Sequence, residues 1–128
     1  MANILVVDDE GQILDSVRRQ LASKGHEVVA RADAQAALTI LQRNPEHFQL
    51  LVTDWRMIPM DGIDLIKSMK LFEELDEVAI ILHTSADAGE LTKALPPGQL
   101  ERWGVRLQSK DRGHDHVGLL RLVEEMLT

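Results

Sequence analysis

Acidic residues stand where two short apolar runs of this sequence end. Asp8-Asp9-Glu10 follows the run Ile4–Val7, and Asp54 directly follows a second such run. If the two runs are neighbouring strands of a parallel sheet, their carboxylates meet at one edge, where mutual repulsion makes it costly to ionise all of them. A hard divalent cation, which prefers oxygen ligands, would neutralise such a cluster. The pattern therefore predicts an Mg²⁺ site.

A hydroxyl and an amine follow two later runs of the same kind. Thr84 comes at the end of the run that begins at Val78, and Lys110 follows the weaker run Val105–Leu107. Phosphoryl transfer to aspartate needs an attacking carboxylate oxygen, together with positive charge and hydrogen-bond donors for the phosphoryl oxygens. Asp54, Thr84, Lys110 and a divalent cation would supply all of these groups.

The apolar runs alternate along the chain with stretches of helical spacing. The runs are Ile4–Val7, Glu27–Ala30, Leu50–Thr53, Val78–Leu82 and Val105–Leu107. Such runs are typical of strands buried on both faces of a parallel sheet. Between them Ile13, Val17 and Leu21 share a helix face, and Asp33 and Asp115 are predicted N-caps of later helices. The alternation predicts an α/β, flavodoxin-like, doubly wound five-stranded parallel sheet of order 2-1-3-4-5 with helices on both faces, whose ligands bind at the carboxyl ends of the strands.

Composition limits the classes of function. With 128 residues the chain suits one hydrophobic core, so a single domain over residues 1–128 is expected. A net charge of −7 argues against direct binding of nucleic acid or of anionic membranes. The chain has no cysteine, which excludes disulfides and thiolate sites, and Val78–Leu82 is too short for a membrane helix. A cytoplasmic location is the expectation.

The order and spacing of these residues resemble the receiver domains of two-component response regulators, over the whole chain. The segments that carry the resemblance are Val6-Val7-Asp8-Asp9-Glu10, Asp54-Trp55-Arg56-Met57, Met60-Asp61-Gly62, Ile80-Ile81-Leu82-His83-Thr84-Ser85 and Lys110. The resemblance implies a switch in which Asp54 accepts a phosphoryl group from a histidine kinase or phosphotransfer protein. Signalling would pass to an unidentified downstream effector, and formation of a homodimer on phosphorylation is a further implication.

The resemblance also assigns roles within the site. Asp9 would bind Mg²⁺ directly and Asp8 through water, while Asp54 and the backbone carbonyl of Arg56 would complete the protein ligands. Thr84 would bind the phosphoryl group and shift on phosphorylation. Lys110 would pair with Asp54 beforehand and with a phosphoryl oxygen afterwards. Gly62 would occupy a loop position with unusual backbone angles.

The chain departs from the family pattern at several places. Ile58 stands where proline is usual, with Pro59 one residue later, and Asp111 stands where proline commonly follows the lysine. The sequence Leu95-Pro96-Pro97-Gly98 must end a helix begun at Ala88 and leave Gln99–Trp103 as a separate turn or short helix. The fourth helical region is therefore expected to be atypical.

The roles of several further residues are less specific. Leu107 stands where an aromatic switch residue is expected, which leaves the signalling face in doubt. Trp55 either packs at the rim or gates the site, with packing favoured, and Arg56 is either simply exposed or faces the phosphoryl group. His83 is expected to pack rather than to act in catalysis, and His114-Asp115-His116 to be a loop leading into a helix rather than a metal site.

Three functions remain open at this stage. The leading one is a switch that catalyses only its own phosphorylation and dephosphorylation, and so is not an enzyme acting on other molecules. The second is a pseudo-receiver that binds proteins without phosphate, for which the segment around Pro96 is the best support. The third, a phosphatase with an aspartate nucleophile, is disfavoured because Arg56 stands where that class needs an acid.

Overall fold

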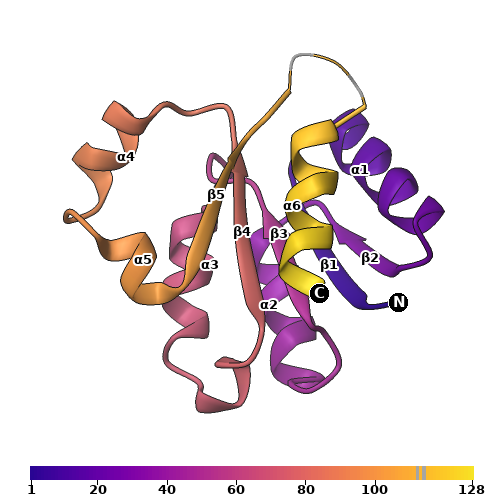
Figure 1. The fold of residues 1–128 in the computed structure, drawn as a ribbon. Helices are drawn as coiled ribbons and strands as arrows, with labels where there is room; N and C mark the ends of the chain where they lie inside the picture. The colour runs from indigo at the N-terminus through magenta and orange to yellow at the C-terminus, as the bar shows by residue number, and fades with distance from the viewer. Residues whose placement is uncertain (112, 114) are drawn as a thin grey trace.

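The apolar runs form one parallel sheet. The computed structural model describes residues 1–111, 113 and 115–128, and in this part of the chain the strands are β1 (Asn3–Val7), β2 (Glu27–Arg31), β3 (Leu50–Thr53), β4 (Ala79–Thr84) and β5 (Val105–Ser109). All neighbouring pairs are parallel, in the order β2-β1-β3-β4-β5 (Figure 1). The predicted fold class and strand order are confirmed, and β1 lies beside β3 as the chemistry of the acidic residues requires.

Helices cover both faces of the sheet. They are α1 (Gly11–Ser23), α2 (Ala34–Arg43), α3 (Gly62–Met69), α4 (Ala88–Ala94), α5 (Gln99–Trp103) and α6 (Val117–Leu127), with a 3₁₀ turn η1 (Glu73–Leu75). Ile4, Val52 and Ile81 belong to the buried cluster that also holds residues of α1 and α6. Leu5 and Leu51 belong to the other cluster, with residues of α2 and α3. Within the described residues, none of the helices has both the length and the apolar character needed to span a bilayer.

Two strands run further than their aliphatic residues predict. β4 continues through His83 to Thr84, which pair in register with Gln108 and Ser109 of β5. His83 and Thr84 are 2% and 1% exposed, so polar residues occupy buried strand positions here. The aliphatic run alone ends too early here, whereas the prediction that the fourth strand ends at His83-Thr84-Ser85 agrees with β4.

The N-caps give one confirmed and one wrong prediction. Asp33 caps α2, because its Oδ1 accepts a hydrogen bond of 2.8 Å from the backbone N–H of Ala36. Asp115 does not cap α6: the N-cap is His116, in the left-handed region at φ 49°, and it makes no capping bond. Instead, the side chain of Asp111 accepts a hydrogen bond of 3.2 Å from the N–H of Gly118, in the first turn of α6. A backbone N–H that would normally donate to an N-cap side chain therefore donates to a residue outside the helix.

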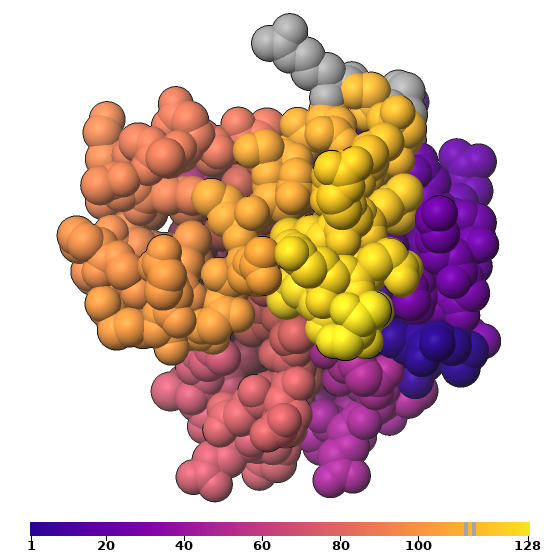
Figure 2. Space-filling view, in the orientation of Figure 1, coloured from indigo at the N-terminus to yellow at the C-terminus, as the bar shows by residue number. Residues whose placement is uncertain are grey.

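The region between β4 and β5 is divided as the prolines predict. α4 ends before Pro96, and α5 follows as a separate short helix over Gln99–Trp103. Leu91 is the buried residue of α4, and α5 has none among its described residues. A hollow of about 280 Å³, lined by residues of both helices and by Leu107 of β5, lies between them, and Figure 2 shows a small opening beside this orange segment.

Candidate functional site

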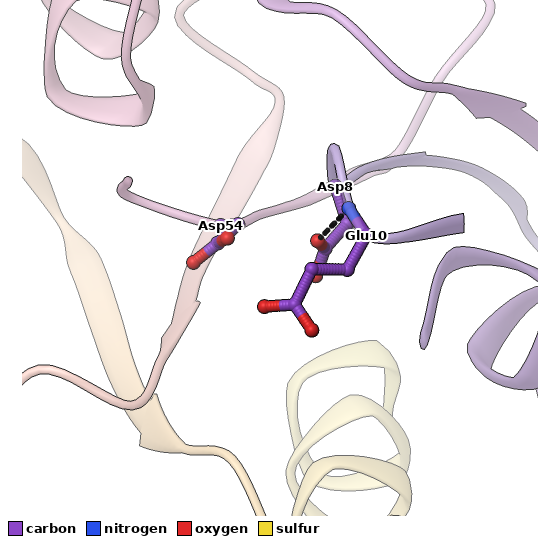
Figure 3. A group of neighbouring side chains, drawn as sticks. All are labelled: Asp8, Glu10 and Asp54. Carbon is purple, nitrogen blue, oxygen red and sulfur yellow. Dashed lines mark hydrogen bonds between the residues drawn. The ribbon is translucent and has the colours of Figure 1, made fainter. Parts of the chain in front are cut away.

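Acidic side chains converge at the carboxyl edge of the sheet. The register pairs Val7 with Thr53, so the residues that follow them, Asp8 and Asp54, leave the sheet side by side. Asp8, Glu10 and Asp54 each offer a carboxylate oxygen, and these oxygens lie within 4.8 Å of one another (Figure 3). Asp8 and Asp54 are only 3% and 5% exposed. The structure thus brings together acids from β1 and β3, as the sequence predicts.

The backbone around Asp54 is held from both sides. Its N–H donates to the carbonyl of Val7 over 2.9 Å, and its Oδ1 accepts a hydrogen bond of 2.8 Å from the N–H of Trp55. A Cβ at Gly62 would overlap the carbonyl oxygen of Asp54. Gly62 is therefore required for space and not for unusual backbone angles, since its φ lies outside the left-handed region.

Lys110 lies within the acidic cluster. Its Nζ is 2.9 Å from Oδ2 of Asp8, 3.2 Å from Oδ2 of Asp54 and 3.7 Å from Oε1 of Glu10. The backbone N–H of Lys110 donates to the carbonyl of Thr84 over 3.0 Å, which extends the pairing of β5 with β4 to this residue. The lysine predicted to pair with Asp54 does so in this structure.

Burial makes negative charge costly in the cluster. Burial raises the pKa of Asp54 to about 6, the charge of Asp8 adds to the increase, and Lys110 opposes it. The pKa of Asp8 is also raised, chiefly by burial. Burial acts to lower the pKa of Lys110, but its contacts with Asp8 and Asp54 outweigh that effect and raise it, so the ammonium stays charged. The carboxylates of Asp8, Glu10 and Asp54 outnumber the ammonium of Lys110. Their oxygens form a set of ligands that suits a divalent cation.

The structure and the family resemblance differ on which neighbour of Asp8 belongs to the acidic cluster. Asp9 is exposed and lies outside the group of converging carboxylates, whereas Glu10 belongs to it. The backbone N–H of Glu10 donates to Oδ1 of Asp8 over 2.9 Å, as Figure 3 shows. Sequence reasoning noticed Glu10 as part of the acidic run but gave it no role. The metal-binding roles of Asp9 and of the Arg56 carbonyl stay predictions.

Thr84 and Trp55 are buried beside the cluster. Thr84 ends β4, and its Oγ1 accepts a hydrogen bond of 3.1 Å from the N–H of Ala86. Trp55 is 5% exposed and belongs to the core cluster, which agrees with the packing interpretation. Arg56 turns toward α4: its guanidinium lies 4.2 Å from the centre of the Trp55 ring, and an Nη atom lies 3.4 Å from Oε1 of Glu90.

A buried histidine pair lies beside the acidic cluster. The rings of His83 and His116 are 6.0 Å apart in an edge-to-face arrangement, and Nε2 of His116 is 3.1 Å from Oγ of Ser16. Burial, aided by the charge of Lys110, lowers the pKa of His83 to about 4. His83 is thus a neutral packing residue, as expected. His114, the first residue of the candidate metal triplet, lies outside the described residues.

Comparison with known sequences gives a consistent result. The model of the response regulator receiver domain matches residues 4–99. The two-component response regulator ORR27 of Oryza sativa is 32% identical over 89 residues, which are 64% of this chain and 14% of that protein. A chemotaxis protein CheY homolog of Campylobacter jejuni is 29% identical over 96 residues, covering 74% of each protein. The matched region is therefore most of one relative and a small part of the other.

Solved structures show the same fold. The chemotaxis protein CheY4 of Vibrio cholerae has a TM-score of 0.80 at 24% identity, covering 98% of each chain. The response regulator TrrA of Thermotoga maritima, solved in complex with Mg²⁺ and BeF, has a TM-score of 0.76 at 23% identity and covers 98% of this chain and 99% of its own. The receiver-domain model matches three quarters of the chain. The sheet order 2-1-3-4-5 and the acidic cluster at its carboxyl edge agree with this match and with the family that the sequence resembles. The chain belongs to the response regulator receiver domain family, and it is a two-component receiver domain rather than a conventional enzyme.

Proposed function

We propose that Asp54 is the phosphoryl acceptor of this receiver domain. The observation that supports this most directly is the buried pair of Asp54 with Lys110, with Nζ 3.2 Å from Oδ2, inside a cluster of further carboxylates. A carboxylate whose pKa is raised to about 6 is still mostly ionised at neutral pH. It is therefore available as a nucleophile and more basic than an ordinary aspartate.

In the proposed reaction a carboxylate oxygen of Asp54 attacks the phosphorus of a phosphohistidine. An O–P bond forms, the P–N bond breaks, and the histidine nitrogen leaves with the bonding electron pair. Lys110 is close enough to Asp54 to pair with a phosphoryl oxygen when the carboxylate is esterified. Thr84 would donate its hydroxyl to another phosphoryl oxygen after leaving its contact with Ala86.

The donor set fits Mg²⁺. Asp8, Glu10 and Asp54 supply carboxylate oxygens within 4.8 Å of one another, and oxygen is the ligand atom that Mg²⁺ prefers. Asp9 is the further ligand that the family resemblance implies, and its exposed side chain is free of the core and could turn toward the cluster. When bound, the ion neutralises charge on the carboxylates and on the incoming phosphoryl group. The complex of TrrA with Mg²⁺ and BeF supports the same assignment for this chain.

The partners follow from the family. Membership of the receiver family implies a histidine kinase as phosphodonor. We further propose that residues 1–128 form one receiver domain, located in the cytoplasm, that acts on an effector domain or protein and makes no direct contact with nucleic acid or membrane. Formation of a homodimer on phosphorylation is part of the same proposal.

Intact mass spectrometry after incubation with acetyl phosphate and Mg²⁺ tests the proposal. We expect one added phosphoryl group in the wild-type protein and none in Asp54→Asn. Omission of Mg²⁺ should remove most of the modification. An unmodified wild-type protein would instead favour the pseudo-receiver alternative, in which the domain binds its partners without phosphate.

A further inference from the structure

The side chain of Arg56 contacts Glu90 of α4 and the ring of Trp55. It stands two residues after Asp54 along the same loop, but its guanidinium points to α4 and lies 3.4 Å from Oε1 of Glu90. The guanidinium also lies 4.2 Å from the centre of the Trp55 ring, which stacks it against the residue that follows the proposed acceptor. The contact of Arg56 with Glu90 therefore joins the loop after β3 to α4.

This ion pair is weak. The side chains of Arg56 and Glu90 are 61% and 48% exposed, and their closest nitrogen and oxygen atoms are 3.4 Å apart. Exposed pairs of this kind contribute little, because water screens them and both long side chains lose freedom. A phosphoryl group on Asp54 carries more negative charge than one carboxylate, so it can compete with Glu90 for the guanidinium.

We propose that Arg56 exchanges between Glu90 and the phosphoryl group, and that Glu90 is a positioning residue that holds Arg56 away from Asp54. The proposal rests on the proposed phosphorylation of Asp54. Binding of the phosphoryl group breaks the contact of the β3–α3 loop with α4, and the presence of Glu90 weakens phosphoryl binding by competition.

Glu90 is fixed in position by hydrogen bonds with Asp87, independently of its contact with Arg56. Its Oε2 accepts a hydrogen bond of 2.9 Å from the N–H of Asp87, and its own N–H donates to Oδ1 of Asp87 over 2.9 Å. These bonds form a capping box at the start of α4. Lys93 stands three residues after Glu90 and lines an open hollow together with Trp55, Arg56 and Glu90, so a second cation lies near Glu90 when Arg56 leaves.

A double-mutant cycle with the phosphoryl mimic beryllofluoride tests the exchange. The proteins are the wild type, Glu90→Gln, Arg56→Gln and the double variant, each titrated by calorimetry at saturating Mg²⁺. Glutamine can keep the capping bonds but removes the charge that holds Arg56. Glu90→Gln should bind beryllofluoride about two- to five-fold more tightly, which is the range expected from loss of an exposed ion pair. Arg56→Gln should bind it more weakly.

The decisive result is the effect of Glu90→Gln in the Arg56→Gln background. We expect no effect there, because the competition needs the guanidinium. An equal tightening in both backgrounds would show a general effect of charge and would overturn the exchange. Glu101→Gln removes a similar exposed charge from α5 and should leave the affinity unchanged. Failure of the wild type to bind beryllofluoride would overturn the proposed function as well, whereas binding with an additive cycle would overturn the exchange alone.

Discussion

The ammonium of Lys110 lies 3.2 Å from Oδ2 of Asp54, and the side chains of the two residues are only 8% and 5% exposed. Loss of Lys110 would leave buried carboxylates without a counter-ion, whereas loss of the Asp54 charge leaves Lys110 paired with Asp8. Asp8, 2.9 Å from the same ammonium, shares that dependence. The charges at this edge of the sheet therefore act as a unit in both stability and chemistry.

Asp54→Asn should abolish phosphorylation and raise the free energy of unfolding at pH 7 by about 1 to 3 kcal/mol. The pKa of Asp54 in the folded protein is about 6, above its ordinary value of 3.8. Its contribution to stability is therefore full below about pH 4 and is lost as the pH rises through about 6. Urea unfolding at pH 7 and pH 4 measures the difference, which should shrink toward the lower pH. The exposed Asp76→Asn is the control, and a less stable Asp54→Asn protein at pH 7 would contradict the argument.

His83 should act on stability in the opposite direction. Its pKa is about 4 in the folded protein and 6.5 ordinarily, so the unfolded chain takes up the proton first as the pH falls. Stability from His83 is full above about pH 6.5 and falls by about 3 kcal/mol on reaching pH 4. His83→Leu should remove this loss, as measured by urea unfolding across the range. A pH profile identical to that of the wild type would show that another group causes the acid sensitivity.

Mg²⁺ binding should change the fluorescence of Trp55, which follows Asp54 directly. We expect Asp9→Ala to abolish the change and Glu10→Gln to reduce it less, because the family resemblance assigns the direct contact with the ion to Asp9, whereas the Glu10 carboxylate is 62% exposed and lies 3.7 Å from Lys110. Trp103→Phe removes the background of the other tryptophan. If the response survives in Asp9→Ala and disappears in Glu10→Gln, then Glu10 is the ligand and the role of Asp9 is wrong.

Gly62→Ala should destabilise the protein by about 2 kcal/mol or more, because overpacking against backbone forces the chain to shift. The added Cβ would overlap the carbonyl oxygen of Asp54, so phosphorylation by acetyl phosphate should slow as well. Gly11→Ala is the matched control, since its Cβ would meet nothing within 4 Å. Thermal unfolding of the two variants should differ clearly, and equal melting temperatures would show that the loop yields easily.

Residues 86–104 should be among the first to exchange their amide hydrogens. The buried residues of this segment are Leu91 and Leu95, and Leu100 and Trp103 are partly buried against the core, so it has fewer buried side chains than α2 or α3. Beryllofluoride with Mg²⁺ should increase protection there, as measured by hydrogen exchange with mass spectrometry. Strong protection in both states would mean that the segment is rigid and that the switch lies on another face.

The strand order was predictable because every strand contains an aliphatic run, and alternating strands and helices permit few topologies. The ends of the strands were harder to predict from aliphatic residues, because His83 and Thr84 are polar and still continue β4. The break at Pro96 was predictable from local backbone chemistry alone. Local sequence thus determines where an element begins or ends when the responsible residue acts on its own backbone, as Pro96 does, or on backbone a few residues away, as Asp33 does.

Contacts between distant residues carried no comparable signal. Asp111 replaces Asp115 at the start of α6 by accepting a hydrogen bond from Gly118, seven residues later, a separation that no capping pattern records. Glu10 joins the cluster and Asp9 does not, because their side chains point in different directions. A run of three acidic residues does not determine those directions. The pairing of Arg56 with Glu90 depends on the approach of α4 to the loop after β3.

The ammonium that pairs with Asp8 and Asp54 comes from the last part of the chain, whereas both acids come from its first half. Synthesis on the ribosome therefore produces these two carboxylates long before their counter-ion. Because like charges at that edge oppose each other, the pairing of β1 with β3 is electrostatically disfavoured in a nascent chain without Lys110. The ammonium of Lys110 offsets this cost once β5 has paired with β4, so a fragment of the chain that ends before Lys110 should pair β1 with β3 less stably unless a cation neutralises the two acids.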